Sequence, residues 1–382
     1  MASDPKPYRL YRGGRVKGKV PAPARPRRET PTDYRGPGAV PKRRRIGRGR
    51  LIVLIVLVLL LLIVVWAVAS WFSVSSGVAD ANARLDPDAK AALTHQSGLL
   101  LSHPTTVLLM GTDNAAVGGR QGDRHSDSIM LLRTDPSHHR LYYLSIPRDL
   151  VVPIPGAATQ KINAAFQIGG PALAIRTIHD YTGLAINHVV VVNFAAFKDL
   201  IDALGGITVN VPAPIHSNRF DCPYATQARC DRWPGWRFAK GSQHMNGERA
   251  LIYSRIRENQ LNPAETDFTR SARQQAVLNA VTSELTSVGT LLRLPFSGGS
   301  FVKPLTTDLT TAQLLQLGWL KFRSSSSSSV HCRLGGDFGG GGTGAPSEDN
   351  PTTIEMFLGK SAPQPPTGQF DPGCVVGHTL PQ

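Results

Sequence analysis

The feature that most constrains this chain of 382 residues is an uninterrupted apolar stretch near its beginning. Residues 51–68 carry only apolar side chains, and the stretch continues to Phe72. A helix of this length, at about 1.5 Å per residue, crosses roughly 30 Å of hydrocarbon. Because the apolar core of a signal peptide has only about 7–15 residues, we predict that residues 51–72 form a transmembrane helix that stays in the protein. Cleavage within the small residues 79–83 is the alternative.

The distribution of charge predicts how this helix lies in a membrane. Residues 1–50 hold 16 of the 42 Lys and Arg residues but only three of the 27 acidic ones, and a basic run from Lys42 to Arg50 adjoins the helix. Such basic clusters stay on the cytoplasmic side. We therefore predict a single-pass protein of the cell membrane, with a cytoplasmic N-terminus and residues 73–382 outside the cell.

The sequence pI of about 10.0 reflects this basic arm rather than the exported part. A basic chain invites comparison with nucleic-acid-binding proteins, but the arm is rich in Pro and Gly and lacks apolar periodicity. That composition is typical of a disordered segment, and a basic cluster beside a span is attracted to the anionic inner leaflet. The prediction is a membrane partner and no nucleic acid.

Four cysteines agree with export. Cys222 and Cys230 close a short loop, and Cys332 and Cys374 lie in the Gly-rich C-terminal region. An oxidising compartment favours disulfides, but four cysteines allow three pairings, and the sequence does not choose between them. A zinc site is the less favoured alternative, because no two cysteines have CxxC spacing.

Beyond the span, segments with strand and helix periodicity alternate. The patterns predict strands at 106–110, 128–132, 141–146, 188–194 and 207–211, and helices at 171–181, 196–204, 246–253, 268–285 and 311–322. This alternation favours an α/β domain with a largely buried, mixed sheet. The predicted organisation is a disordered basic arm (1–50), a transmembrane helix (51–72), an extracellular stalk (73–103), a main folded domain (104–330) and a largely disordered tail (331–382).

Two aspartates stand where the first two predicted strands meet. Asp113 follows the first strand at its carboxyl end, where α/β sheets usually bind ligands, and Asp127 directly precedes the second strand. The loop between them can bring both carboxylates to one edge of the sheet. Paired carboxylates without His or Cys ligands suit Mg²⁺, which often binds together with substrate phosphate. The alternative is that both aspartates only stabilise the loop.

Arginines at the ends of predicted strands and helices indicate a phosphate ligand. The set consists of Arg148, Arg255, Arg257, Arg270 and Arg273. The planar guanidinium binds phosphate oxygens in a bidentate manner, which suits a diphosphate. Each arginine alone is more often a solvated surface charge, so this interpretation depends on the set as a whole.

Seven ordered segments give the chain a resemblance to a known family. They are VLLMGTD (107–113), HSDSIMLL (125–132), LSIPRDL (144–150), KINAAFQIGG (161–170), DALGGITVNV (202–211), HMNGERALIYSRIR (244–257) and DFTRSARQQAVL (267–278). Together they resemble the LytR-CpsA-Psr family, over residues 104–285 and on to about 330. The resemblance implies an α/β/α sandwich around a central mixed sheet, preceded by the transmembrane helix, and an apolar channel for a polyprenyl chain. It also implies a membrane-anchored phosphotransferase that moves a glycopolymer from a polyprenyl-pyrophosphate carrier onto peptidoglycan outside the cell.

The resemblance also assigns roles to single residues. The predicted catalytic residues are Asp113, Asp127, Arg148 and Asp267, of which Asp113 and Asp127 are the predicted Mg²⁺ ligands. The predicted pyrophosphate-binding residues are Arg124, Arg148, Lys161, Arg255, Arg257, Arg270 and Arg273. The family usually has Arg two residues before the second aspartate, where this chain has His125. Either His125 or Arg124 can fill that position.

The sequence leaves three functions open. In a transferase, a sugar hydroxyl of peptidoglycan is the nucleophile, and Asp113 or Asp267 is the candidate base; salt bridging to arginines is the alternative role for both. A pyrophosphatase acting on the same lipid-linked substrate would use the same site. A non-catalytic polyprenyl-pyrophosphate-binding or wall-assembly protein would need only the binding residues. The chain has no G-x-S-x-G or HExxH motif, so neither a serine hydrolase nor a zinc peptidase is supported.

Overall fold

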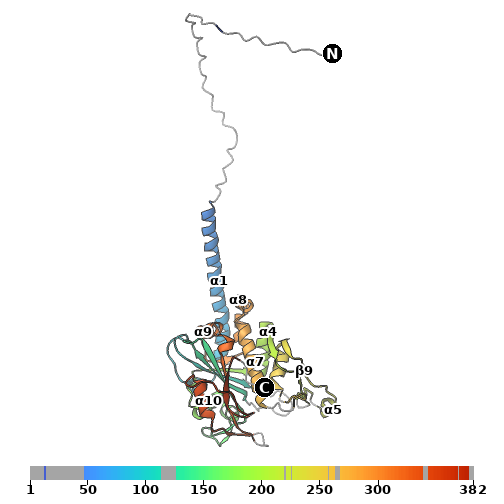
Figure 1. Ribbon diagram of the computed structural model, residues 1–382. Coiled ribbons are helices and arrows are strands. Elements are labelled where there is room, and N and C mark those ends of the chain that lie inside the picture. Colours follow the sequence, from blue (N-terminus) through green and yellow to red (C-terminus); the bar gives the residue numbers. More distant parts are fainter. Residues whose placement is uncertain are drawn as a thin grey trace, which may run out of the picture. The chain divides into compact units, whose positions relative to one another are not determined.

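The apolar stretch forms one continuous helix, α1 (Arg48–Ala83), which is long and apolar enough to cross a membrane. The computed structural model describes Gly13 and residues 47–112, 126–218, 221–224, 226–256, 258–262, 267–338, 343–368 and 370–377. The chain divides into two units, residues 1–56 and 57–382. Of the first unit, the described part is Gly13 and residues 47–56. The second unit contains the rest of α1 and the whole folded domain (Figure 1).

The end of α1 packs on the folded domain instead of forming a stalk. Three of its residues are buried in one apolar cluster with α8 (Val288–Val302), namely Val74, Val78 and Ala81. Their spacing of four and three residues puts them on one helix face. The chain then turns into α2 (Pro87–Ala91), where Leu85 and Ala89 enter the main core. Residues 73–103 therefore do not form the separate stalk that was predicted, because this helix face is apolar and packs on the folded domain.

Seven strands form the central sheet, in the order β11-β6-β1-β2-β3-β12-β15. Their bounds are β1 (Thr106–Thr112), β2 (Ser126–Asp135), β3 (Arg140–Ile146), β6 (His188–Asn193), β11 (Thr306–Thr307), β12 (Val330–Arg333) and β15 (Gly373–Val376). The pairs β1–β6 and β3–β12 are parallel, and the other four pairs are antiparallel. The sheet is mixed, as predicted.

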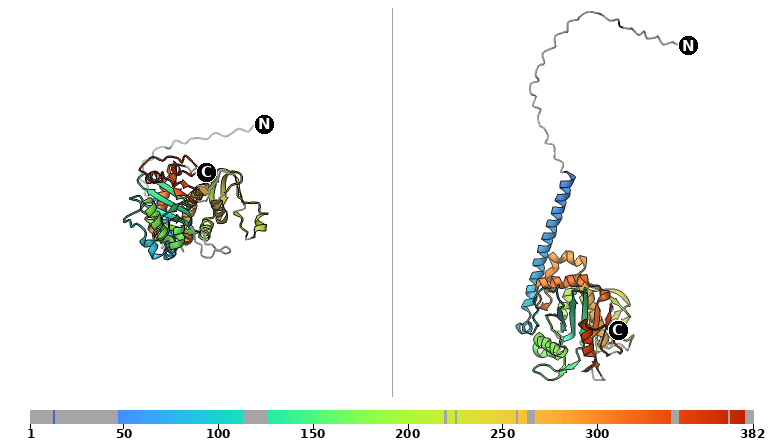
Figure 2. Two further views of the ribbon diagram at one scale, coloured as in Figure 1. Left: turned by 90° about the horizontal axis from the view of Figure 1, so that it is seen from below. Right: turned by 60° about the vertical axis from the view of Figure 1, so that its left-hand side comes forward.

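Alternating side chains along these strands build a core on each face of the sheet. Leu108 and Leu131 belong to the main core, together with residues of α2, α3 (Ala164–Thr182) and α10 (Asn350–Phe357). Met130 and Tyr143 point to the other face, where they pack against α7 (Asp267–Leu285). Helices thus cover both faces (Figures 1 and 2), which confirms the α/β/α sandwich.

A second apolar cluster stands beside this sandwich. It joins α7 to two further helices and a two-stranded sheet, α4 (Phe194–Leu204), α6 (Gly247–Arg255), β7 (Ile207–Val211) and β10 (Gly241–Met245). The remaining elements are β4 (Val151–Val152), β5 (Gln160–Lys161), β8 (Ile215–His216), α5 (Gln227–Cys230), β9 (Arg237–Phe238), α9 (Thr311–Arg323), the 3₁₀ helix η2 (Ser326–Ser328), β13 (Gly336–Asp337) and β14 (Ala345–Pro346).

The C-terminal region is part of the fold. Both β12 and β15 belong to the central sheet, and the Cys332–Cys374 disulfide joins them. The Arg333 guanidinium donates to the carbonyls of Gly368 at 2.9 Å and Asp371 at 3.0 Å. The prediction of a largely disordered tail at 331–382 is therefore wrong. Its strands and helix pair and pack with elements that are far away in the sequence.

Candidate functional site

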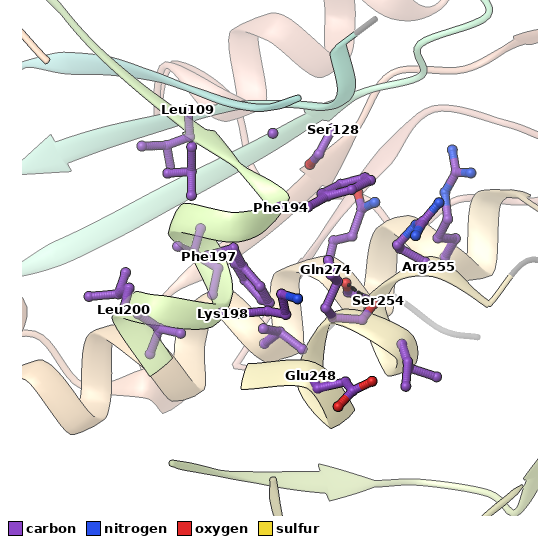
Figure 3. A pocket seen from close by; sticks show the side chains of 18 of the residues that line it. Leu109, Ser128, Phe194, Phe197, Lys198, Leu200, Glu248, Ser254, Arg255 and Gln274 are labelled. Atoms are coloured by element: carbon purple, nitrogen blue, oxygen red, sulfur yellow. Dashed lines mark hydrogen bonds between the residues drawn. The ribbon is translucent and has the colours of Figure 1, made fainter. Parts of the chain in front are cut away.

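A pocket of about 700 Å³ lies between the α7 side of the sheet and helices α4, α6 and α7. Side chains from β1, β2 and β6 form its floor, and most of the lining is apolar. Figure 3 shows Arg255 and Leu200 at opposite ends of this pocket. The pocket therefore has a polar end and an apolar end, and its volume is within the range of about 300–1,000 Å³ that is usual for ligand sites.

Two arginines define the polar end. Arg255 is the last residue of α6, and its guanidinium lies 4.4 Å from the centre of the Phe194 ring. Arg270 comes from the first turn of α7 and is only 7% exposed. Both line the pocket together with Ser128 and Gln274. Two fixed cations beside a hydroxyl and an amide suit a ligand with several phosphate oxygens.

The apolar end is built by the second half of α7 and the segments around it. The lining residues there include Leu200, Val281, Leu285 and Leu305. Leu285 is the last residue of α7, and Leu305 lies just after α8. A ligand that fills the whole pocket must therefore combine an apolar chain with an anionic group.

The edge of the sheet beside the polar end contains an irregularity at Asp127. Thr112 of β1 pairs with Ser126, whereas Gly111 pairs with Ser128, which makes Asp127 the extra residue of a bulge. Bulges are frequent beside active sites, where they end regular strand pairing. The backbone thus brings Asp127 next to the end of β1, whose following residue is Asp113. This agrees with the predicted meeting of the two loop ends.

Several predicted site residues lie outside the described part of the chain. These are Asp113, Arg124, His125 and Arg257, and of Asp127 and Asp267 only the backbone is described. Asp267 is the first residue of α7, three residues before Arg270. The roles of all six residues stay predictions.

Arg148 and Lys161 are held together by a carboxylate that the sequence did not single out as a site residue. Asp149 accepts from Arg148 Nε at 3.2 Å and from Lys161 Nζ at 2.7 Å. Arg148 follows the end of β3 by two residues, and that end, Ile146, pairs with Ile129 just after the bulge. Arg148 is thus at the same edge of the sheet as Asp127, although it does not line the pocket.

Arg273 is buried in the fold, away from the pocket. It is 0% exposed, and its guanidinium donates to the Ile256 carbonyl at 2.5 Å, which ties α7 to the end of α6. It does not line the pocket. The three-residue spacing that grouped Arg273 with Arg270 in the sequence does not put both side chains at one site, so we leave Arg273 out of the proposed site.

A buried polar network fixes the middle of α7 on the sheet. Gln275 donates to Ser145 Oγ at 2.7 Å, and its Oε1 lies 3.1 Å from His331 Nδ1. The ring of His331 stacks on Tyr143 at 4.8 Å, and burial raises the pKa of this tyrosine, so the phenol stays neutral. This network positions the helix that carries Arg270 and Gln274.

We expect the Gln275→Met variant to lose about 1–3 kcal/mol of folding stability, because the substitution keeps the volume but removes two buried hydrogen bonds. Chemical unfolding measures this loss. The matched control is Gln274→Met, since Gln274 is only partly buried and lines the pocket instead. Equal stability of the two variants would contradict the positioning role of Gln275.

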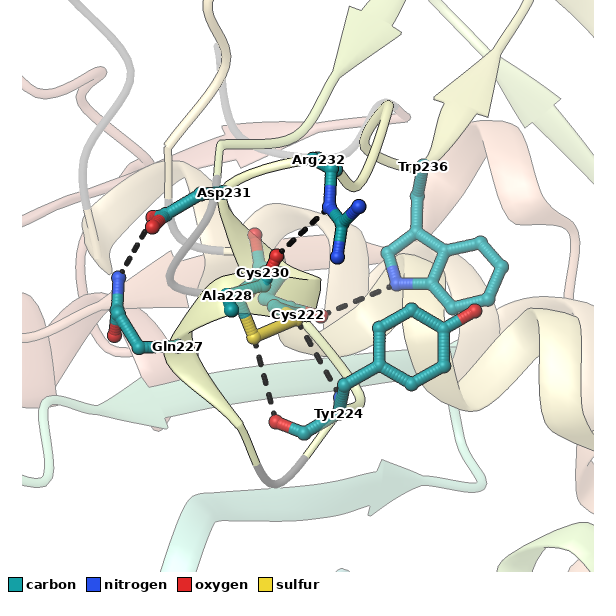
Figure 4. The surroundings of a disulfide bond; sticks show 9 residues. Cys222, Tyr224, Gln227, Ala228, Cys230, Asp231, Arg232 and Trp236 are labelled. Atoms are coloured by element: carbon teal, nitrogen blue, oxygen red, sulfur yellow. Dashed lines mark hydrogen bonds between the residues drawn. A yellow bond between two sulfur atoms is a disulfide. The ribbon is translucent and has the colours of Figure 1, made fainter.

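The Cys222–Cys230 loop forms one wall of the pocket. Asp221, Cys222, Pro223 and Trp236 line the pocket, and the disulfide closes the loop with its Cα atoms 5.6 Å apart. The Trp236 indole, which lies beside this disulfide in Figure 4, donates to the Asp221 carbonyl at 3.3 Å. The two disulfides are Cys222–Cys230 and Cys332–Cys374, one of the three pairings that the sequence allowed. Which of the three pairings forms depends on contacts between residues that are far apart in the sequence.

Sequence reasoning also missed lining residues that have no motif of their own. Lys198 and Glu248 line the pocket, and so does Phe194, whose ring contacts the Arg255 guanidinium. Their sequence signal is weak, because a Phe, a Lys or a Glu on an amphipathic helix is ordinary. Only the packing of α4 against α6 brings them together.

Known proteins are similar to this chain in sequence and in fold. The teichoic acid transferase TagV of Bacillus subtilis is 34% identical over 194 residues, which is 50% of this chain and 46% of TagV. The transferase TagU of Bacillus cereus is 30% identical over 259 residues, 66% of this chain and 76% of TagU. Both are named polyisoprenyl-teichoic acid–peptidoglycan teichoic acid transferases. The match to TagV thus spans less than half of that relative.

Solved structures are also similar to this chain in fold. The crystal structure of Bacillus subtilis TagV superimposes with a TM-score of 0.51 at 26% identity, covering 68% of this chain and 98% of TagV. A structure of TagT bound to LIIa-WTA gives a TM-score of 0.54 at 25% identity, covering 73% of this chain and 99% of TagT. The model of the LytR_cpsA_psr family matches residues 68–333. The chain therefore belongs to the LytR_cpsA_psr family.

Proposed function

We propose that this protein is a membrane-anchored phosphotransferase that moves a glycopolymer from a polyprenyl-pyrophosphate carrier onto peptidoglycan. The observation that carries the proposal is the pocket with Arg255 and Arg270 at one end and an apolar lining beyond them. A polyprenyl pyrophosphate has the same division into an apolar chain and a compact anion. The names of the relatives TagV and TagU support the same donor and acceptor classes.

The proposed reaction exchanges one phosphorus–oxygen bond for another. A peptidoglycan hydroxyl attacks the phosphorus that carries the glycan, and the bond from this phosphorus to the bridging oxygen breaks. Polyprenyl monophosphate leaves, and the glycan becomes joined to peptidoglycan through a phosphodiester. The hydroxyl proton passes to a carboxylate, for which Asp113 and Asp267 are the candidates. Negative charge grows on the bridging oxygen, and fixed guanidinium groups at Arg255 and Arg270 stabilise it there.

Arg148 and Lys161 act beside these two arginines. Their shared partner Asp149 holds both cations at the end of β3, at the edge that also carries Asp127. A cation whose position is already fixed needs no reorganisation when the pyrophosphate binds. We propose that Arg148 contacts the phosphates at the mouth of the pocket.

The residues present fit a divalent cation. What supports this is the bulge, which brings the backbone of Asp127 beside Thr112, the last residue of β1, while Asp113 follows Thr112 in the sequence. Oxygen ligands of this kind suit Mg²⁺. We propose that Asp113 and Asp127 hold Mg²⁺, which when bound neutralises phosphate charge.

Removal of divalent cations with EDTA is expected to abolish transfer, and added Mg²⁺ is expected to restore it. An Asp127→Asn variant is expected to need at least about tenfold more Mg²⁺ for half-maximal rate, because the neutral amide is a weaker ligand. The matched control is Asp135→Asn at the other end of β2, where the carboxylate binds Ser137 and His138. Equal Mg²⁺ requirements in both variants would contradict the metal assignment.

The proposed orientation of α1 in the membrane rests on the positive charge at its N-terminal end. The basic run from Lys42 to Arg50 directly precedes the apolar part of α1. We propose that this run stays in the cytoplasm and that the folded domain lies outside, where peptidoglycan is.

The function is tested with the full-length protein in membranes, a radiolabelled polyprenyl-pyrophosphate glycan and Mg²⁺, with and without peptidoglycan. The proposal predicts label in the insoluble peptidoglycan, and much less of it with Arg148→Ala. Release of soluble glycan phosphate at the same rate without acceptor would instead indicate a pyrophosphatase. Tight lipid binding without turnover would indicate a binding or wall-assembly protein.

A further inference from the structure

Two helices of the folded domain expose stripes of large apolar side chains. On α8 these residues are spaced by four, and on α9 by four and three, so that each set lies on one helix face. We call these six residues the docking face: Val288, Leu292, Phe296, Leu315, Trp319 and Phe322. Phe296 is 87% exposed and Val288 71% exposed. Exposed apolar groups in such number mark a surface that has a partner.

The docking face lies where the span enters the folded domain. Val302 of α8 and Leu314 of α9 both join the apolar cluster of α1. A Cβ on Gly77 of α1 would lie 2.5 Å from the Gly299 oxygen, so the backbones of α1 and α8 touch. In Figures 1 and 2, α8 and α9 lie at the end of the folded domain from which α1 rises. The apolar stripes are thus next to the boundary between the span and the domain.

The two helices that carry the docking face hold basic residues and no carboxylate, while Asp80 of α1 pairs with Lys303 just after α8, at 3.9 Å. Neither α8 nor α9 contains Asp or Glu, and between Glu284 and Asp337 the single carboxylate is Asp308. Asp308 is already paired with His188, at 2.6 Å. Both helices carry basic residues, and the Arg323 guanidinium lies 6.0 Å from the centre of the Trp319 ring. Apolar stripes with tryptophan and basic residues, and without carboxylates, are typical of helices that lie in an anionic membrane surface.

We propose that the docking face inserts into the headgroup region of the lipid bilayer beside α1, on the side where the folded domain lies. The proposal rests on the proposed membrane anchoring through α1. Continuity with the span and the absence of acidic residues from α8 and α9 favour anionic lipid over a second copy or another protein. The docking face would give the folded domain a second contact with the membrane, in addition to the span.

This orientation has a consequence for the pocket. Its apolar end is bounded by Leu285 and Leu305, the residues that flank α8 on either side. Arg255 lies at the end opposite to Leu200. The docked domain therefore holds the apolar end of the pocket next to the bilayer and the arginine end away from it. A polyprenyl chain can then enter from the lipid phase while its pyrophosphate reaches the arginines.

Spin labels on introduced cysteines test the docking face, because all four native cysteines form disulfides. The full-length chain is reconstituted in nanodiscs of phosphatidylglycerol and phosphatidylcholine, with the label at Leu292→Cys. The matched control is Leu261→Cys, a leucine of similar exposure in the connection before α7. A label at Leu59→Cys reports on the span itself. Collision rates with oxygen, which concentrates in lipid, and with a water-soluble nickel chelate are measured.

The proposal predicts an oxygen-to-nickel ratio at position 292 about five times that at position 261 and lower than that at position 59, which lies deeper in the bilayer. A ratio at 292 equal to that at 261, with position 59 in lipid, would overturn the docking face and leave the anchor intact. A label at 59 that is open to nickel would overturn the anchoring and the docking face with it. Spin–spin broadening at 292 would show a second copy on this face and would also overturn the proposal.

Discussion

Replacing Arg255 with alanine is expected to lower kcat/KM for glycopolymer transfer by about 100-fold, or roughly 2.7 kcal/mol of transition-state stabilisation. Arg255 lines the polar end of the pocket, and Phe194 holds its guanidinium in place at 4.4 Å. The change removes a fixed cation from the place where charge grows on the bridging oxygen. Initial rates of transfer at several carrier concentrations measure this loss.

Arg249 on the same helix provides a matched control. Its guanidinium also lies 4.4 Å from a phenylalanine ring, that of Phe238, but it does not line the pocket. We expect Arg249→Ala to keep kcat/KM within about threefold, although it loses the cation–π contact and also the hydrogen bonds to the Arg237 carbonyl at 3.0 Å and to Gln243 Oε1 at 3.3 Å. Equal loss of activity in the two variants would mean that Arg255 acts through folding and not through the substrate.

Replacing both Cys332 and Cys374 with alanine is expected to lower folding stability by about 4 kcal/mol, since the bond closes a loop with a sequence separation of 42 residues. Both cysteines are fully buried and face each other in β12 and β15, at the edge of the central sheet. The unfolding midpoint of the full-length protein is expected to fall by roughly 8 °C. Thermal unfolding in detergent measures the shift.

The Cys222–Cys230 pair is the control for this prediction. Its sequence separation is only 8 residues, so the same loop-entropy argument gives a loss of about 2.5 kcal/mol. It also lies in a loop that lines the pocket, so its removal is expected to affect carrier binding more than stability. A smaller loss of stability for the Cys332–Cys374 variant than for the Cys222–Cys230 variant would contradict an ordered C-terminal region.

Local sequence patterns predicted the elements of the core with good accuracy. The predicted helix at 268–285 is α7, and Asn246, the first residue of the helix predicted at 246–253, is the N-cap of α6 and accepts from the Arg249 backbone N–H at 2.9 Å. The predicted helix at 171–181 is the second part of α3, which begins earlier, at Ala164, and kinks at Gly169 and Gly170. Periodicity and capping are properties of neighbouring residues, so they can be seen without the fold.

The wrong predictions of a stalk and of a disordered tail have the same physical cause, which is packing between residues far apart in the sequence. Val74, Val78 and Ala81 look unremarkable after an apolar span, but they pack on α8, more than 200 residues later. In the C-terminal region, β12 pairs with β3, whose partner residues lie almost 190 positions earlier, and Phe357 of α10 enters the main core. A window of neighbouring residues contains none of these contacts, so glycine and proline dominated the prediction.

The candidate site was predictable from the sequence only where it depends on local patterns and not on packing. The positions of Arg255 and Arg270 at the ends of α6 and α7 follow from local patterns, and both line the pocket. Whether an arginine near the start of α7 turns to the pocket or to the Ile256 carbonyl depends on packing, which separates Arg270 from Arg273. The bulge at Asp127 depends on the register between two strands, and the sequence does not reveal it.

Transfer carried out in ¹⁸O-labelled water tests the central claim most directly. The reaction contains the full-length protein in membranes, the polyprenyl-pyrophosphate glycan, Mg²⁺ and peptidoglycan, and the phosphate attached to the glycan is analysed by mass spectrometry. A transferase takes the new oxygen from a peptidoglycan hydroxyl, so we predict that this phosphate carries no ¹⁸O and is bound to peptidoglycan. A glycan phosphate that carries ¹⁸O in the presence of acceptor would show attack by water, and would contradict the transferase.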